Sequence, residues 1–103
     1  MTVSKKCAMT LLGLFLLVEA GNASAYTGQK FAGEAKISME QARVIALKAY
    51  PGKITDEELE REKGGSGLRY SFDIRRGKAT REVGVDARTA ALLENAPEGP
   101  NAD

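Results

Sequence analysis

The chain has 103 residues, of which 28% are charged, with 15 Lys and Arg against 14 Asp and Glu. This length allows one small domain, and the near-neutral charge gives no general attraction to nucleic acid or to an anionic membrane surface. Histidine is absent and cysteine occurs once, which excludes a catalytic triad of serine, histidine and aspartate.

The first 25 residues have the pattern of a cleaved secretory signal peptide. A basic pair, Lys5 and Lys6, precedes a short apolar run from Ala8 to Val18, whereas a membrane-spanning helix needs about 20 residues. The small side chains that follow favour cleavage between Ala25 and Tyr26. An uncleaved anchor is the alternative, and the shortness of the apolar run argues against it. We therefore expect a periplasmic or secreted protein with no stable membrane insertion after cleavage.

Cleavage leaves 78 residues without a cysteine, because Cys7 precedes the apolar run. The mature chain then has no disulfide and no thiolate for catalysis or metal binding. Its first residues, 26–36, contain two glycines and no sustained apolar periodicity, which predicts a flexible leader. We expect the folded domain to begin at Ile37.

A helix is predicted from Met39 to Tyr50. Ser38 and Gln41 form a capping box, in which each side chain bonds the backbone N–H of the other residue, and Pro51-Gly52 ends the pattern. Small apolar residues recur on one helical face: Ala42, Ile45, Ala46 and Ala49. Such a face lets another layer approach closely, and we expect it to pack on a sheet.

The clearest strand is Leu68 to Ile74, where apolar and polar residues alternate. Gly77-Lys78 suits a two-residue hairpin turn and fixes the pairing of the strands on either side. The expected partners are Phe72 with Val83, Tyr70 with Val85, and Asp73 with Glu82. This register places the apolar side chains of both strands on one face.

The segment from Lys53 to Lys63 supports two interpretations. Its acidic residues have high helix propensity, and Glu57 and Arg61 have helical spacing. However, the segment lies between a Pro-Gly break and a glycine loop, directly before the clearest strand, where a hairpin partner belongs. We therefore predict a charged edge strand, whose charges discourage aggregation.

The end of the chain is predicted to hold a short final strand, Ala90 to Leu93, and a disordered tail, Asn95 to Asp103, which has nothing to bury. The fold class is thus α+β. One N-terminal helix packs on a small antiparallel sheet of three to four strands.

The order and spacing of these elements resemble the PepSY domain. The motifs that carry the resemblance are Ile37-Ser38-Met39-Glu40-Gln41-Ala42, Tyr50-Pro51-Gly52-Lys53, Tyr70-Ser71-Phe72-Asp73-Ile74 and Val85-Asp86-Ala87-Arg88-Thr89. The resemblance spans about Ala35 to Leu93, and we assign the domain to residues 37–94. It implies a role in inhibiting or regulating peptidases, because PepSY domains occur in propeptides of secreted metallopeptidases, in membrane-bound regulators and as single exported proteins.

The chain departs from the family pattern at two positions. The family usually has Thr-Gly after the Asp-Ala pair, whereas this chain has Thr89-Ala90, and the first strand usually has an apolar residue where Glu57 stands. An alanine in a turn that needs positive φ is strained by about 1 kcal/mol. The resemblance therefore leaves open a changed turn type or a short helix before the last strand.

Six charged residues are candidate contacts to a partner: Asp56, Glu58 and Glu60 on the edge strand, and Arg75, Arg76 and Lys78 at the hairpin tip. The acidic residues lack the spacing of a calcium loop, and a solvated strand face is the simpler explanation. The cations could grip a phosphate or an acidic partner, or serve solubility alone. No aromatic residue is interleaved with them, which argues against nucleic acid.

We predict no catalytic residue, cofactor or metal. An enzyme that uses carboxylates alone, or a serine with a lysine, ranks below two non-enzymatic hypotheses. The leading hypothesis is a PepSY-type module that regulates or inhibits a protein partner, such as a peptidase or an envelope sensor, by strand addition at its edge. The alternative is an envelope protein that binds a small ligand or a metal.

Overall fold

The computed structural model of the protein describes residues 26–98. The elements in this part of the chain are the 3-10 helix η2 (Gln29–Glu34), the α-helix α2 (Met39–Ala49), and the strands β3 (Lys53–Arg61), β4 (Leu68–Arg76), β5 (Ala79–Asp86) and β6 (Leu92–Pro97). The predicted signal peptide, residues 1–25, and the last residues of the predicted tail, 99–103, lie outside the described residues. Between residues 26 and 98, neither helix is long and apolar enough to cross a membrane.

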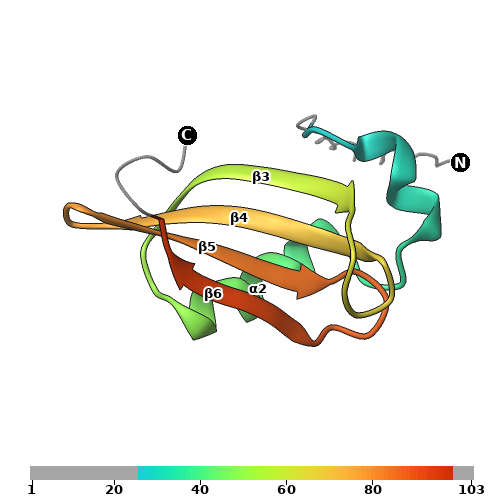
Figure 1. Cartoon of the computed structure of the whole chain (residues 1–103). Helices are drawn as coiled ribbons and strands as arrows, with labels where there is room; N and C mark the ends of the chain where they lie inside the picture. The colour runs from blue at the N-terminus through green and yellow to red at the C-terminus, as the bar shows by residue number, and fades with distance from the viewer. Residues whose placement is uncertain (1–25, 99–103) are drawn as a thin grey trace, which may run out of the picture.

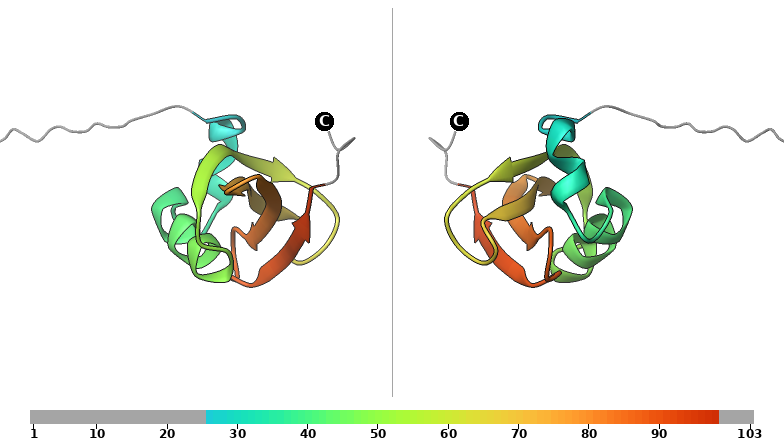
Figure 2. Two further views of the ribbon diagram at one scale, coloured as in Figure 1. Left: turned by 90° about the vertical axis from the view of Figure 1, so that its left-hand side faces the viewer. Right: turned by 90° about the vertical axis from the view of Figure 1, so that its right-hand side faces the viewer.

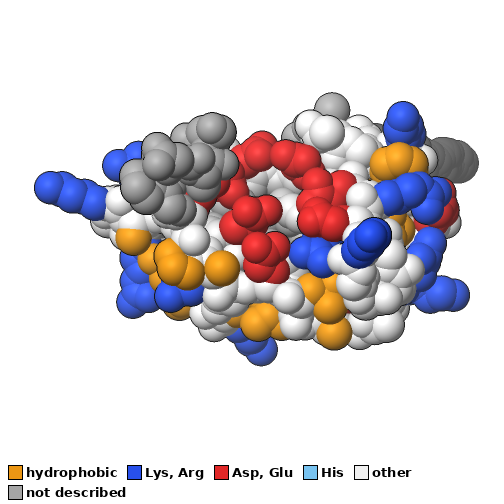
Figure 3. Space-filling model, viewed as in Figure 1, with side chains coloured by type: hydrophobic (Ala, Val, Ile, Leu, Met, Phe, Trp, Pro, Cys, Tyr) orange, Lys and Arg blue, Asp and Glu red, His pale blue; other side chains and the backbone are white. Residues whose placement is uncertain are grey.

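The strands form one antiparallel sheet in the order β3-β4-β5-β6. Helix α2 covers the far face of this sheet in Figure 1, and η2 lies beside the edge strand β3 (Figures 1 and 2). The face turned to the viewer carries a group of acidic side chains (Figure 3). The structure confirms the predicted α+β fold and the prediction that β3 is an edge strand.

Helix α2 begins where its capping box predicts. The hydroxyl of Ser38 accepts the Gln41 N–H at 3.1 Å, and the Gln41 side-chain oxygen accepts the Ser38 N–H at 2.8 Å. The helix buries Met39, Ala42 and Ala46. These residues belong to the core that the helix shares with the sheet, which confirms the prediction that this helix packs on a sheet.

The β4–β5 hairpin has the predicted register. Its pairs are Phe72 with Val83, Tyr70 with Val85, and Asp73 with Glu82. The apolar members of these pairs are at most 1% exposed and form the core together with α2. The buried ring of Tyr70 also fixes the approach to the helix, because its hydroxyl donates to the carbonyl oxygen of Ile37 at 2.8 Å.

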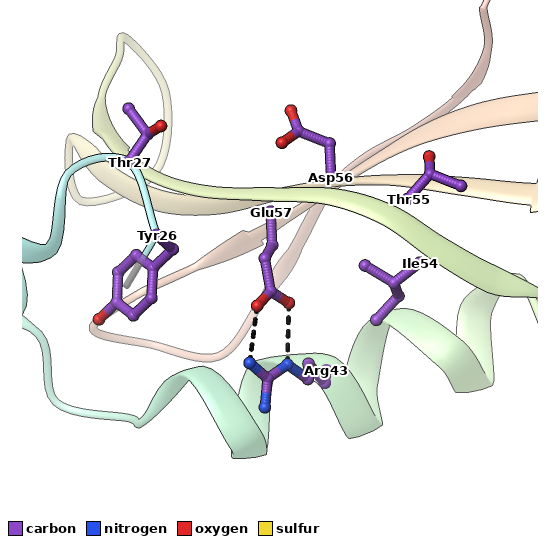
Figure 4. Close-up of a pocket in the computed structure, with 7 residues that line it drawn as sticks. All are labelled: Tyr26, Thr27, Arg43, Ile54, Thr55, Asp56 and Glu57. Atoms are coloured by element: carbon purple, nitrogen blue, oxygen red, sulfur yellow. Dashed lines mark hydrogen bonds and ion pairs between the residues drawn. The ribbon is translucent and has the colours of Figure 1, made fainter. Parts of the chain in front are cut away.

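Strand β3 contains an extra residue that changes which of its side chains face the helix. The pairing with β4 shifts between Ile54 and Asp56, which makes Thr55 a bulge. Side chains of a regular strand alternate in direction, so Ile54 and Glu57 would point to opposite faces. The bulge turns both of them toward α2 (Figure 4).

The contacts of the leader were not predicted from the sequence. Residues 26–36 were expected to be flexible, whereas the structure has η2 there, in contact with β3. The Leu59 N–H donates to the Thr27 carbonyl at 2.8 Å, and the Lys36 N–H donates to the Ala87 carbonyl at 2.8 Å. These bonds join residues far apart in sequence, so no local pattern signals them.

The last strand also differs from its prediction. Strand β6 starts two residues after the predicted Ala90 and includes 95–97, which the sequence assigned to a disordered tail. In the turn before β6, Ala90 has φ of 69°, and among residues 26–98 no other non-glycine residue has positive φ. The turn is therefore strained at Ala90, and the last strand nevertheless forms.

Candidate functional site

A groove of about 740 Å³ lies between the edge strand β3 and helix α2. Its lining comes from the leader, the helix and the strand: Tyr26 and Thr27, Arg43, and Ile54, Thr55, Asp56 and Glu57. Figure 4 shows Thr55 and Asp56 pointing away from the helix, and the two other β3 side chains pointing toward it. The groove thus places an exposed strand edge beside a space that can receive a side chain.

The floor of the groove holds an ion pair between the helix and the strand. Arg43 donates to the Glu57 carboxylate through Nε at 2.8 Å and through Nη2 at 2.7 Å (Figure 4). This bond to Glu57 raises the pKa of Arg43 above its ordinary value, and the two parallel bonds fix both side chains in direction. The ion pair accommodates an acid, Glu57, on the helix-facing side, where the resemblance noted in the sequence led us to expect an apolar residue.

The leader covers only the second half of the β3 edge. Thr27 forms a parallel bridge with Glu58, and Gly28 lies against the carbonyl of Leu59. The first half of the strand, Lys53 to Glu57, lies before this bridge and beside the groove. Because an edge strand presents backbone N–H and C=O groups to an added strand, this half can pair with an extended segment of another chain.

Carboxylates gather on the sheet face opposite α2, around a hollow of about 210 Å³ (Figure 3). The hollow is lined by Asp56, Glu58, Glu60, Ser71, Asp73, Glu82 and Glu98. Burial raises the pKa of Glu58, and the charges of Glu60 and Asp56 raise it further. Burial, and next the charge of Glu94, also raise the pKa of Glu82. In the described part of the chain, no group of three or more His, Cys, Asp or Glu side chains is arranged to hold a metal ion.

The charged residues predicted as partner contacts fall into two groups that do not form one site. Asp56, Glu58 and Glu60 line the acidic hollow, whereas Arg75, Arg76 and Lys78 do not. The last three lie in or next to the turn between β4 and β5, where the Arg75 Nε donates to the Gly77 carbonyl at 3.0 Å. The Arg76 guanidinium lies over the Tyr50 ring, 5.4 Å from its centre. Of these six residues, only Asp56 also lines the groove beside β3.

Asp86, at the end of β5, is fully buried and organises the loops around it. Its carboxylate accepts the backbone N–H groups of Ser66, Arg88 and Thr89 at 2.6, 2.8 and 3.0 Å, and the Ser66 hydroxyl at 2.8 Å. Burial alone would raise the pKa of Asp86, but these hydrogen bonds outweigh it and hold the pKa well below its usual range. An aspartate at the start of a turn commonly accepts a backbone N–H two residues on, and here that donor is Arg88. Asp86 thus supports the structure and is not exposed to a ligand.

Sequence reasoning singled out only part of the groove: Asp56 was a candidate contact and Glu57 a departure from the family pattern, whereas Arg43 was not a candidate. Arg43 lies outside the apolar face of its helix, and its partner Glu57 is 14 positions away. The acid at position 57, where the resemblance led us to expect an apolar residue, could have indicated this ion pair. An acid at a helix-facing strand position requires a cationic neighbour. The leader residues gave no signal beyond the conformational freedom of their glycines.

Comparison with known families finds a match to the PepSY family, described as Peptidase propeptide and YPEB domain, over residues 36–95. The matched region covers more than half of the chain and includes α2, β3, β4, β5 and the start of β6. The search of curated proteins and the search of solved structures gave no match.

Proposed function

Because the chain belongs to the PepSY family, we propose that it is a non-enzymatic interaction module that regulates or inhibits a protein partner, such as a peptidase or an envelope sensor. The family description names peptidase propeptides, which supports a role in binding proteins. The sequence contains no histidine, and its cysteine lies in the predicted signal peptide. We propose that this peptide is removed between Ala25 and Tyr26, and that the protein acts in the periplasm or outside the cell.

The observation that carries this proposal is the first half of β3, from Lys53 to Glu57. It is at the edge of the sheet and beside the groove under α2. An extended segment of the partner adds there by main-chain hydrogen bonds, and one of its side chains enters the groove. The ion pair of Arg43 and Glu57 forms a polar floor, so we expect a partner side chain with a polar or charged end at that position.

The alternative function, a small-ligand or metal binder, has the acidic hollow as its best location. Its carboxylates lie on the face away from α2 and include no arrangement suited to a metal within residues 26–98. The hollow also has a structural explanation, because three of its acids lie on the edge strand β3, and charges on an edge strand discourage edge-to-edge association. We therefore give preference to the β3 edge.

Site-specific photo-crosslinking in the envelope tests the proposal. A photoreactive amino acid replaces Thr55, which is exposed on β3 and lines the groove. The matched control carries the same amino acid at Val44, which is 57% exposed on α2. Both variants are exported, irradiated in cells and analysed by mass spectrometry.

A peptidase or sensor crosslinked from Thr55 and not from Val44 supports the proposal. Crosslinks from Val44 alone would place the partner on the helix and contradict strand addition. If neither position yields a protein adduct although both variants are folded and exported, the protein does not act through a protein partner at this edge.

A further inference from the structure

The second half of the β3 edge already binds a segment of the chain itself, which makes one β-bridge and then enters the 3-10 helix. Thr27 pairs with Glu58 in parallel, and its carbonyl accepts the Leu59 N–H at 2.8 Å. The leader therefore uses at one position the same kind of main-chain hydrogen bond that an added strand from a partner would use. This intramolecular contact indicates which features a segment needs in order to bind at this place.

Three residues of the leader, spaced by three positions, carry its side of the contact. Gly28 has φ of 88°, and a Cβ at this position would overlap the Leu59 carbonyl, so the position requires glycine. Phe31 is half-buried, and the Arg61 guanidinium lies 4.8 Å from the centre of its ring. The 3-10 helix has three residues per turn, which brings the third residue, Glu34, to the same side.

Glu34 closes the contact by pairing with two arginines of the domain. Its carboxylate accepts a hydrogen bond from Arg61 at 2.7 Å and one from Arg88 at 3.3 Å. Strand β3 and the loop after β5 thus supply a cationic clamp for an acidic side chain. This surface fits a segment with a glycine, an aromatic residue three positions later, and an acidic residue three positions after that.

The leader lies at the surface of the domain, where Tyr26 and Phe31 pack against the core without being fully buried. Helix η2 has no buried residue, and the side chains of Arg61 and Glu34 are 54% and 41% exposed. Exposed ion pairs contribute less than about 1 kcal/mol each. Because the leader is covalently linked to the domain, its effective concentration at the β3 edge is in the millimolar range, and this favours its binding there.

We propose that the second half of the β3 edge is a peptide-binding surface, and that the leader is its resident ligand. A partner segment with the pattern glycine, aromatic residue, acid displaces the leader and pairs with Leu59, Arg61 and Arg88. The inference rests on the proposed function and adds to it the chemistry of the partner segment. Displacement of the leader also extends the edge available to the partner from the first half of β3 to its full length.

The test measures binding of a synthetic fluorescent peptide with the sequence of residues 26–36. The protein is the exported chain, either unaltered, as Gly28→Ala, or as the matched control Gly33→Ala. Gly28→Ala forces the leader off the edge by its overlap with the Leu59 carbonyl, whereas a Cβ at Gly33 meets no atom within 4 Å. A second loosened variant, Glu34→Arg, repels the arginine clamp and does not depend on the glycine.

We expect both loosened variants to bind the peptide at least about tenfold more tightly than the unaltered protein and Gly33→Ala, because the tethered competitor is gone. A peptide with alanine in place of its first glycine should bind none of them. If folded Gly28→Ala and folded Glu34→Arg bind the peptide no better than the unaltered protein, the inference is wrong. If a partner crosslinks at Thr55 but the peptide does not bind, the proposed function stands and this inference fails. If the peptide binds but no partner crosslinks, the peptide-binding surface stands and the proposed function fails.

Discussion

The loops around Asp86 and the leader on β3 both connect distant parts of the chain by polar contacts, but they differ in burial. The Asp86 carboxylate is fully buried and accepts hydrogen bonds from three backbone N–H groups and one hydroxyl. The leader is attached by exposed ion pairs, by one backbone hydrogen bond to β3, and by the packing of the half-buried Tyr26 and Phe31 against the core. Buried polar groups are costly to separate, whereas exposed ones exchange readily with water. We therefore expect stability to depend on Asp86 and binding to depend on the leader.

Replacing Asp86 should have the largest effect on stability. In Asp86→Asn the side-chain NH2 group replaces one carboxylate oxygen and faces N–H donors in a buried place, so hydrogen bonds are lost. The unfolding free energy should fall by about 3 kcal/mol. Urea unfolding followed by circular dichroism measures it. The matched control Glu62→Gln changes an exposed acid of the β3–β4 loop and should stay within about 0.5 kcal/mol of the parent. An equal loss in both variants would contradict the special role of Asp86.

Acid should destabilise the protein through the same carboxylate. The pKa of Asp86 is lowered in the folded state, so its contribution is complete above the ordinary aspartate pKa of about 4 and is lost as the pH falls below that value. The raised pKa values of Glu58 and Glu82 act in the opposite direction and favour the folded state on mild acidification. Urea unfolding from pH 7 to pH 2.5 should show stability falling below about pH 4. A flat profile there, or an equal fall in Asp86→Asn, would contradict this assignment.

Relieving the strained turn should have a smaller, stabilising effect. Ala90 has φ of 69°, a conformation that costs a residue with a Cβ about 1 kcal/mol and glycine little. Ala90→Gly should therefore raise the unfolding free energy by about 1 kcal/mol. The neighbouring Ala91→Gly serves as control and should lower it, because glycine there only adds freedom to the unfolded chain. Destabilisation by Ala90→Gly would show that the turn is not strained.

Loosening the leader should have the smallest effect on global stability. Glu34→Gln weakens the bonds to Arg61 and Arg88, which are exposed, so the unfolding free energy should fall by no more than about 0.5 kcal/mol. Thermal unfolding monitored by circular dichroism measures this change. A loss of more than about 2 kcal/mol would mean that the leader is part of the core and is not an exchangeable ligand.

The sequence predicts those parts of the fold that local patterns encode. The capping box of Ser38 and Gln41 marks the start of α2, and alternation around Gly77 fixes the β4–β5 register. The leader contact at Leu59 could not be predicted in this way, because it depends on a backbone hydrogen bond between residues far apart. The same holds for the candidate site, since Arg43 and Glu57 meet only once the bulge has turned the strand.

The most direct test of the central claim compares two backbone amides in the exported protein by hydrogen exchange at neutral pH. The Leu59 N–H is bonded to Thr27 of the leader, and the Ala87 N–H is bonded to Leu68 within the fold. If the leader detaches while the domain stays folded, the opening free energy of Leu59 should lie at least about 2 kcal/mol below that of Ala87. Equal opening free energies, with Leu59 exchanging only through global unfolding, would show that the leader does not leave the β3 edge.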